Sequence, residues 1–171
     1  MAEKRILHVG CGTEATPEWL PGVSVRLDID PGVEPDIVAS ILDLGPLSEF
    51  DVVYCSHTLE HVYPHEVSVA LGEFRRVLKD GGAVLIFVPD LEDQKPTDDV
   101  LYNSDAGPVT GFDLFYGYRP FVEMYPNTMA HHCGFVSSTM RRAMEDAGFG
   151  KVTVQRIPCC NLFAAGMKNV G

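Results

Sequence analysis

Two glycines at the end of an apolar segment are the first feature that could do chemistry. Residues 5–9 are predicted to form a buried strand, and Gly10-Cys11-Gly12 follows it directly. Glycines at such a turn let a ligand approach the backbone, because no side chain stands in the way. With Ala15, the loop satisfies the G-x-G-x-x-A form of the dinucleotide fingerprint. The loop predicts a nucleotide-like ligand, and a tight turn without a ligand is the alternative.

Two carboxylates follow predicted strands where such a ligand would need them. Asp28-Ile29 ends a second strand over 23–29, and an acid at this place suits ribose hydroxyls. Asp43 follows a short strand within 36–44, where it could accept a hydrogen from an adenine amino group. Its neighbours Leu42 and Leu44 would then flank the ring. A solvated loop acid at 28 and an ordinary turn residue at 43 are the alternatives.

The segment after the glycine loop separates two kinds of cofactor. A dinucleotide pyrophosphate favours a helix N-terminus, because the free N–H groups and the dipole there attract phosphate. Thr16 and Pro17 can begin a helical turn, but Pro21-Gly22 ends it at once. S-adenosylmethionine carries no phosphate, so the shortened helix favours it. An NAD-type Rossmann oxidoreductase remains the alternative.

The elements that must position these residues alternate between strands and helices. Apolar spacing predicts helices over 64–78 and 137–147. It also predicts strands over 5–9, 23–29, 36–44 (a short strand within it), 50–55, 83–88, 152–157 and 162–167. This alternation is typical of an α/β fold with a parallel sheet. The last two strands must pair as an antiparallel hairpin, because only a short turn joins them.

Several segments together resemble class I S-adenosylmethionine-dependent methyltransferases, in particular the small bacterial methyltransferase-domain group often labelled type 11. These segments are 6–12, 27–31, 50–62, 77–82 and 135–157. The resemblance implies a Rossmann-like, seven-stranded, mostly parallel sheet whose last strand is antiparallel, here with shortened first and second crossover helices. It also implies that S-adenosylmethionine is the cofactor and that it is bound by Gly10, Cys11, Gly12, Asp28, Ile29, Asp43, Leu44, Ser56 and His57.

The chain departs from that family's pattern at two positions. His8 stands where the family usually has an acid that helps to hold the methionine ammonium, and Glu14 stands where it often has a third glycine. We hypothesise that Glu14 replaces the missing acid. The departures also leave open a non-enzyme interpretation, in which the chain is a catalytically inactive domain that still binds S-adenosylmethionine.

Residues 92–134 are expected to be an insertion within a single domain that spans residues 1–171. The insertion is rich in turn residues and aromatic side chains. In this fold, ligands bind outside the carboxyl ends of the strands, where the insertion emerges. We therefore expect a lid that shapes a pocket for a small-molecule methyl acceptor, and extra core over a bare sheet face is an equal alternative.

A hydroxyl or ammonium acceptor would have to lose a proton, and the side chain suited to this at pH 7 is histidine. The candidates are His131, beside the expected pocket, and His57 and His61, which follow the fourth strand. Positioning of the reactants without a base is the alternative. The kind of atom that is methylated stays undetermined at this level.

Composition excludes several other classes of function. The formal charge of −11 disfavours nucleic acid, and no apolar run approaches the ~18 residues of a membrane span. The N-terminus has no signal-peptide pattern, which predicts a cytoplasmic location. The cluster His131-His132-Cys133 and the pair Cys159-Cys160 miss the usual zinc spacings, so no metal site is predicted. The short crossovers leave one sheet face thinly covered, which predicts a homodimer.

Overall fold

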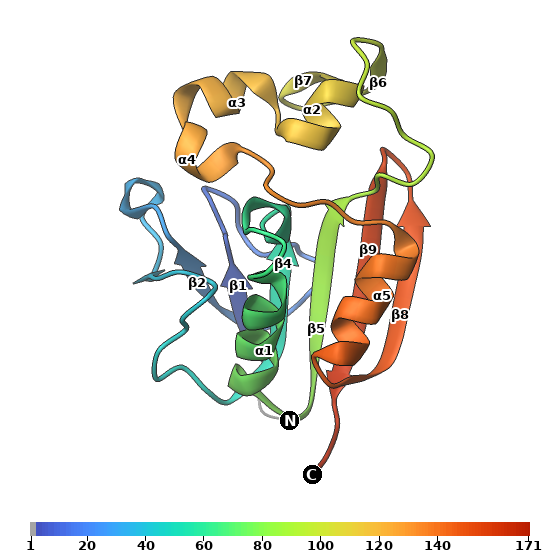
Figure 1. The fold of residues 1–171 in the computed structure, drawn as a ribbon. Coiled ribbons are helices and arrows are strands. Elements are labelled where there is room, and N and C mark those ends of the chain that lie inside the picture. Colours follow the sequence, from blue (N-terminus) through green and yellow to red (C-terminus); the bar gives the residue numbers. More distant parts are fainter. Residues whose placement is uncertain (1–2) are drawn as a thin grey trace.

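The computed structural model describes residues 3–171 and is built around one seven-stranded sheet. The strand order is β3-β2-β1-β4-β5-β9-β8, and only β9 runs antiparallel to its neighbours (Figure 1). The strands are β1 (Arg5–Val9), β2 (Val23–Asp28), β3 (Ile37–Val38), β4 (Phe50–Ser56), β5 (Leu78–Pro89), β8 (Phe149–Ile157) and β9 (Asn161–Lys168). The predicted fold class is therefore confirmed.

The direction of strand addition reverses at β1, which pairs with both β2 and β4. The pair of β1 and β4 is therefore the topological switch point of the sheet, and open α/β sheets bind ligands outside the carboxyl ends of the strands at such a point. The glycine loop follows β1 at this edge, and the segment that contains His57 follows β4 there. The topology alone thus brings two of the predicted site segments together.

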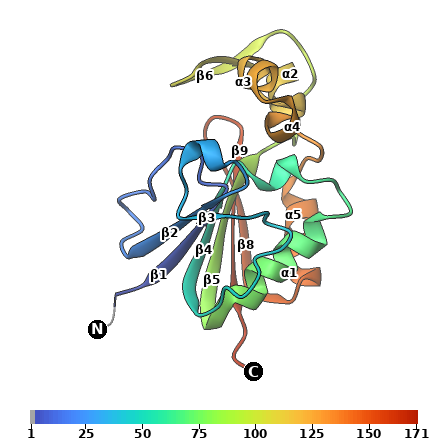
Figure 2. The same cartoon turned by 90° about the vertical axis from the view of Figure 1, so that its left-hand side faces the viewer.

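Two amphipathic helices cover one face of the sheet, α1 (Val67–Val77) and α5 (Ser137–Asp146). Both lie on the same side of it in Figure 2. The buried residues of α1 recur at helical spacing, as do Met140 and Met144 in α5, and they pack on the inward side chains of β1, β4 and β5. Among the described residues, no helix is long and apolar enough to cross a membrane.

The opposite face of the sheet has little cover. Within residues 10–36 there is a turn at 17–20 and the short 3-10 helix η1 (Pro31–Val33), but no α-helix. The segment after Thr16 forms a single turn and no longer helix, because Pro21 and Gly22 prevent its continuation. Leu20 from this loop packs on the sheet with Ile6, Val52 and Tyr54, while Leu85 and Phe87 stay partly exposed.

The segment 92–134 forms a separate layer over the carboxyl ends of the strands (Figure 1). It contains a hairpin, β6 (Val100–Ser104) and β7 (Gly107–Thr110), followed by α2 (Gly111–Tyr116), α3 (Arg119–Met124) and α4 (Pro126–Met129). Thr110 and Asp113 form a capping box at the start of α2. The chain then returns to the sheet, where Phe135 bridges to Asp90 at the end of β5.

Candidate functional site

The glycine loop after β1 needs its two glycines for different reasons. Both residues have positive φ, 60° at Gly10 and 50° at Gly12, which favours glycine. A Cβ at Gly10 would lie 2.2 Å from the side chain of Thr58, so Gly10 is required by packing. A Cβ at Gly12 would meet nothing within 4 Å. The space beside the Cα of Gly12 is therefore open to a ligand, whereas its N–H and carbonyl are bonded to Asp28 and Arg26.

Asp28 lies beside this opening, at the end of β2. Its Oδ2 accepts a hydrogen bond of 2.8 Å from Gly12 N, and its Oδ1 accepts one of 2.9 Å from Asp30 N. Each carboxylate oxygen has two lone pairs, so both can still accept a ligand hydroxyl. The next residue, Ile29, leaves 57% of its surface exposed. A carboxylate and an apolar side chain at this edge fit the ribose and the adenine of a nucleoside.

The other residues predicted to line the cofactor are placed unevenly. Cys11 is buried, so only its backbone can face a ligand. Asp43 is exposed and accepts a hydrogen bond from Gly45 N at 3.0 Å. Leu44 is buried in the core, and its N–H donates to Glu73 Oε2 at 2.7 Å. Its side chain therefore cannot flank an adenine ring, whereas Leu42 is only half-buried.

His8 is buried and electrically neutral. Its ring contacts Tyr54 edge-on, with 4.9 Å between centroids, and its Nδ1 has no hydrogen-bond partner among the described residues. Burial, helped by the nearby charge of Arg26, lowers the pKa of His8 to about 4. A neutral imidazole does not supply the negative charge of the acid that it replaces. Glu14 is exposed, and its replacement of that acid stays a prediction.

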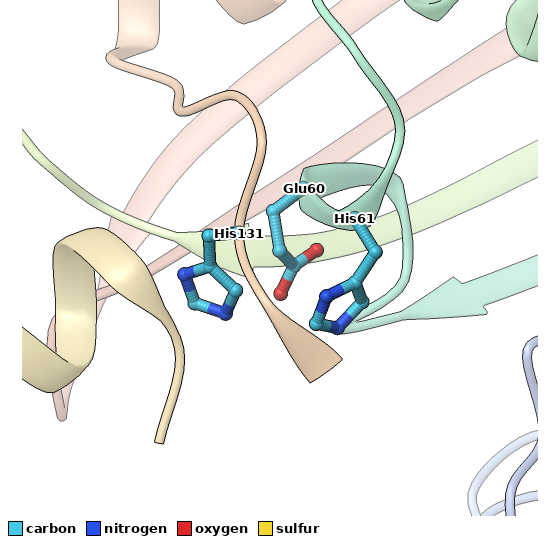
Figure 3. Close-up of side chains that lie close together, drawn as sticks. All are labelled: Glu60, His61 and His131. Carbon is cyan, nitrogen blue, oxygen red and sulfur yellow. The ribbon is translucent and has the colours of Figure 1, made fainter. Parts of the chain in front are cut away.

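The three histidines proposed as catalytic meet around a carboxylate that the sequence did not single out. Glu60 belongs to the 3-10 helix η2 (Leu59–His61), and its side chain is only 1% exposed. His57 Nδ1 lies 3.4 Å from Glu60 Oε1. The rings of His61 and His131 lie 5.1 Å apart between centroids. In Figure 3 the carboxylate of Glu60 lies between these two rings.

Buried charge sets the protonation of this cluster. Burial alone would raise the pKa of Glu60, but His57 and the other histidines outweigh it and lower that pKa. Burial also opposes protonation of His57, yet the adjacent Glu60 raises the pKa of His57 overall. At His131, burial dominates and lowers the pKa. Glu60 is thus ionised, and His131 is neutral near pH 7.

Hydrogen bonds tie the end of the insertion to the loop after β4. The backbone N–H groups of His132 and Cys133 both donate to the carbonyl of Glu60, at 2.9 and 3.2 Å. His61 Nδ1 lies 3.1 Å from the carbonyl oxygen of Ala130, and His131 Nδ1 lies 3.1 Å from that of Leu114. The two histidines therefore have fixed orientations.

Tyr118 is the aromatic side chain of the insertion that lines its pocket. A pocket of about 300 Å³ lies within the insertion, and its walls include Thr110, Asp113, Tyr118 and Arg119. Several other large side chains of the insertion are exposed, namely Tyr116, Phe121, Met124 and Tyr125. This pocket is not lined by the glycine loop or by the histidine cluster.

Comparison with known proteins places this architecture in a class. Residues 7–86 match the family model described as a methyltransferase domain. That match and the fold together confirm the resemblance to class I S-adenosylmethionine-dependent methyltransferases that the sequence motifs indicated. No curated protein matches the chain.

Solved structures have a similar fold over nearly the whole of this chain, at low sequence identity. An S-adenosylmethionine-dependent methyltransferase from Mesorhizobium loti is 17% identical, with a TM-score of 0.67 over 97% of this chain and 91% of that one. A Burkholderia thailandensis 1,6-didemethyltoxoflavin-N1-methyltransferase, solved with 1,6-didemethyltoxoflavin and S-adenosylhomocysteine, is 15% identical, with a TM-score of 0.64 over 99% and 72%. Human N-acetylserotonin methyltransferase, in complex with SAM, is 14% identical, with a TM-score of 0.65 over 98% and 48%. The chain spans only 50–63% of three other matched structures.

Proposed function

We propose that this chain is an S-adenosylmethionine-dependent methyltransferase that acts on a small-molecule acceptor. One observation carries the proposal: the Asp28 carboxylate is hydrogen-bonded to the loop at Gly12, where the space beside the Cα is open, at the switch point of a methyltransferase fold. Structures that share this fold hold S-adenosylhomocysteine or SAM.

The residues around this point have separate parts in cofactor binding. The backbone of Gly10, Cys11 and Gly12 would line the methionine portion, and Asp28 would accept the ribose hydroxyls. The exposed Ile29 and the half-buried Leu42 offer apolar surface to the adenine, and Asp43 offers a carboxylate to its amino group. When bound, the cofactor supplies an electrophilic methyl group on a sulfonium.

On the acceptor side, His57 is the best placed of the three histidines. It directly follows β4, is 47% exposed, and is oriented by Glu60. His61 and His131 are only partly exposed and have their Nδ1 atoms engaged by backbone carbonyls. We therefore assign the proton-accepting role to His57, with Ser56 beside it against the cofactor. An acceptor that needs no deprotonation would require only positioning by these groups.

Support for a small acceptor comes from charge and from similar folds. The charge of −11 opposes binding to nucleic-acid phosphates. The Burkholderia and human enzymes are named for small molecules. An NAD-type oxidoreductase is less favoured, because the described residues 10–22 offer no helix N-terminus to a pyrophosphate. The neutral His8 is the observation that favours an inactive binding domain. The cytoplasmic location stays a prediction.

Calorimetric titration with S-adenosylhomocysteine and with NAD tests the cofactor. We expect one site for S-adenosylhomocysteine and none for NAD. Asp28→Asn should weaken S-adenosylhomocysteine about tenfold or more, because hydrogen bonds to a charged group are the stronger ones. Asp30→Asn is the matched control, since it removes a neighbouring charge that faces its own turn. NAD binding by the native protein, or equal affinity in Asp28→Asn, would contradict the proposal.

A further inference from the structure

The cluster around Glu60 contains acceptors that lack donors. Neither carboxylate oxygen of Glu60 has a hydrogen-bond partner among the described residues, although the side chain is 1% exposed. His61 and His131 each donate from Nδ1 to a backbone carbonyl, since a carbonyl oxygen can only accept. In each neutral ring, Nε2 then carries no hydrogen and has a lone pair. One nitrogen of each ring and a carboxylate oxygen of Glu60 lie within 4.8 Å of one another.

Such an arrangement calls for a cation. A buried carboxylate without partners is strongly unfavourable, and two neighbouring lone pairs add to its repulsion. His57 compensates only in part, because it lies 3.4 Å from Oε1 and is half exposed, so Oε2 has no counterpart among the described residues. A metal ion would satisfy all three groups at once.

We propose that Glu60, His61 and His131 bind one divalent transition-metal ion of the zinc class. Their ligand atoms lie within 4.8 Å of one another, and a tetrahedral zinc site would bring them to roughly 3.5 Å by small side-chain rotations. Two imidazoles and one carboxylate suit zinc and similar metals and leave a position open to another ligand. The carbonyls of Ala130 and Leu114 fix the ring orientations, as the outer contacts of metal-bound histidines do.

The site differs from the one whose spacing was considered in the sequence. The thiol of Cys133 donates to the carbonyl of Leu59 at 3.4 Å and is not part of the cluster. Cys159 and Cys160 lie in the turn between β8 and β9. The cluster instead brings His131 together with Glu60 and His61, two adjacent residues of η2. Rules for the spacing of metal ligands within one segment do not apply to such an arrangement.

The metal would join the insertion to the edge of the sheet. His131 belongs to the insertion, whereas Glu60 and His61 follow β4 (Figure 3). Binding to the folded state alone would raise the thermal midpoint of unfolding as the metal concentration rises. The proposal does not depend on the identity of the cofactor.

Titration of untagged, metal-free protein with Co²⁺ tests the site, with visible absorption reporting nitrogen and oxygen ligation. We expect one Co²⁺ per chain, competition by Zn²⁺ and a higher thermal midpoint. His131→Gln and His61→Gln should each weaken Co²⁺ binding at least about tenfold. His65→Gln and His132→Gln are matched controls that should leave it unchanged, since neither residue is part of the cluster.

Three results would overturn the proposal: no saturable binding by the native protein, equal affinity in His131→Gln and His61→Gln, or equal losses in the controls. Glu60→Gln, which keeps the shape of the side chain, should also lose binding; if it does not fold, the two histidine variants decide. Titration of the same samples with S-adenosylhomocysteine separates the two proposals. Cofactor binding without Co²⁺ binding would reject the metal site alone.

Discussion

The imidazole of His8 occupies a position where the resembling methyltransferases usually carry an acid, two residues before Gly10. Burial against Tyr54 and the charge of Arg26 keep it neutral, while Asp28 opposes them only weakly. Because its Nδ1 has no partner among the described residues, His8 contributes packing but leaves one buried nitrogen unsatisfied. Its protonation therefore bears on stability more directly than on ligand binding.

His8 should make the folded state sensitive to mild acid. Its pKa is about 4 in the folded chain, against 6.5 for an unperturbed histidine, so the unfolded chain binds more protons between these values. The free energy of unfolding should therefore fall as pH drops from 6.5 to 4, by about 2 kcal/mol at pH 5. Urea unfolding at pH 7 and pH 5 measures this loss.

In His8→Leu this part of the pH dependence should disappear, whereas the exposed His65→Leu should retain it. A loss between pH 7 and pH 5 that is as large in His8→Leu as in the native chain would show that other groups are responsible.

Residue types near strand ends led to the prediction of Gly12, Asp28 and His57, because each lies at the end of a strand or just after it. Their roles in binding and catalysis stay predictions. Glu60 was missed, since its importance arises from burial and from contact with His131 across the insertion. The burial of Leu44 was also unforeseen. The sequence shows that an apolar Leu44 follows a polar Asp43. Whether the Leu44 side chain faces the core or a ligand depends on how α1 packs.

Among the elements, the short helix α2 depends on its first turn. Burial alone would raise the pKa of Asp113, but hydrogen bonds from Thr110 and Arg119 outweigh it and lower that pKa to about 2. The same carboxylate caps the helix and holds the start of α3 through Arg119 N at 3.1 Å. Asp113 thus joins two helices of the insertion.

Asp113→Asn should destabilise the protein by up to about 2 kcal/mol at neutral pH. The pKa of this carboxylate is lowered from 3.8 to about 2 in the folded chain. It therefore stabilises the fold above pH 3.8, and this stabilisation is lost as the pH falls to about 2. The native and variant chains should therefore converge in thermal midpoint near pH 2. Asp98→Asn is the control, because Asp98 is 80% exposed and pairs with the same Arg119. An equal effect of both substitutions would contradict this account.

Periodicity predicted α1, α5 and most of the strands, because the buried residues of each element recur regularly on one or both of its faces. The elements of the insertion were not predicted, since helices of four to six residues show too little period to be recognised. Whether these short helices form depends on their capping contacts and on the hydrogen bonds of Asp113 to other residues of the insertion.

At the scale of the molecule, one sheet face lacks α-helices among the described residues (Figure 2). Trp19 is 58% exposed above it and packs toward Tyr54 and Phe87, and Phe87 also contacts Phe163 of β9. Parallel sheets are ordinarily covered on both faces. The sequence-based prediction of a homodimer has its candidate surface here.

Sedimentation velocity over a range of protein concentrations tests that prediction. We expect a dimer in the native protein and a shift toward monomer in Phe163→Glu, because a charge on this face opposes its burial. Val69→Glu serves as the control, since Val69 is equally apolar and 49% exposed but lies on α1, across the sheet. A native protein that stays monomeric at every concentration would contradict the prediction.

The place of β9 in the sheet has a consequence for synthesis on the ribosome. β9 follows the other sheet strands in sequence, yet it lies between β5 and β8. A nascent chain that has emerged only to β8 has no partner for the outer edge of β5, and an unpaired strand edge invites association with other chains. The fold can therefore close only after residues 161–168 leave the exit tunnel, so translation pauses before this stretch would prolong the exposure of β5 to chaperones.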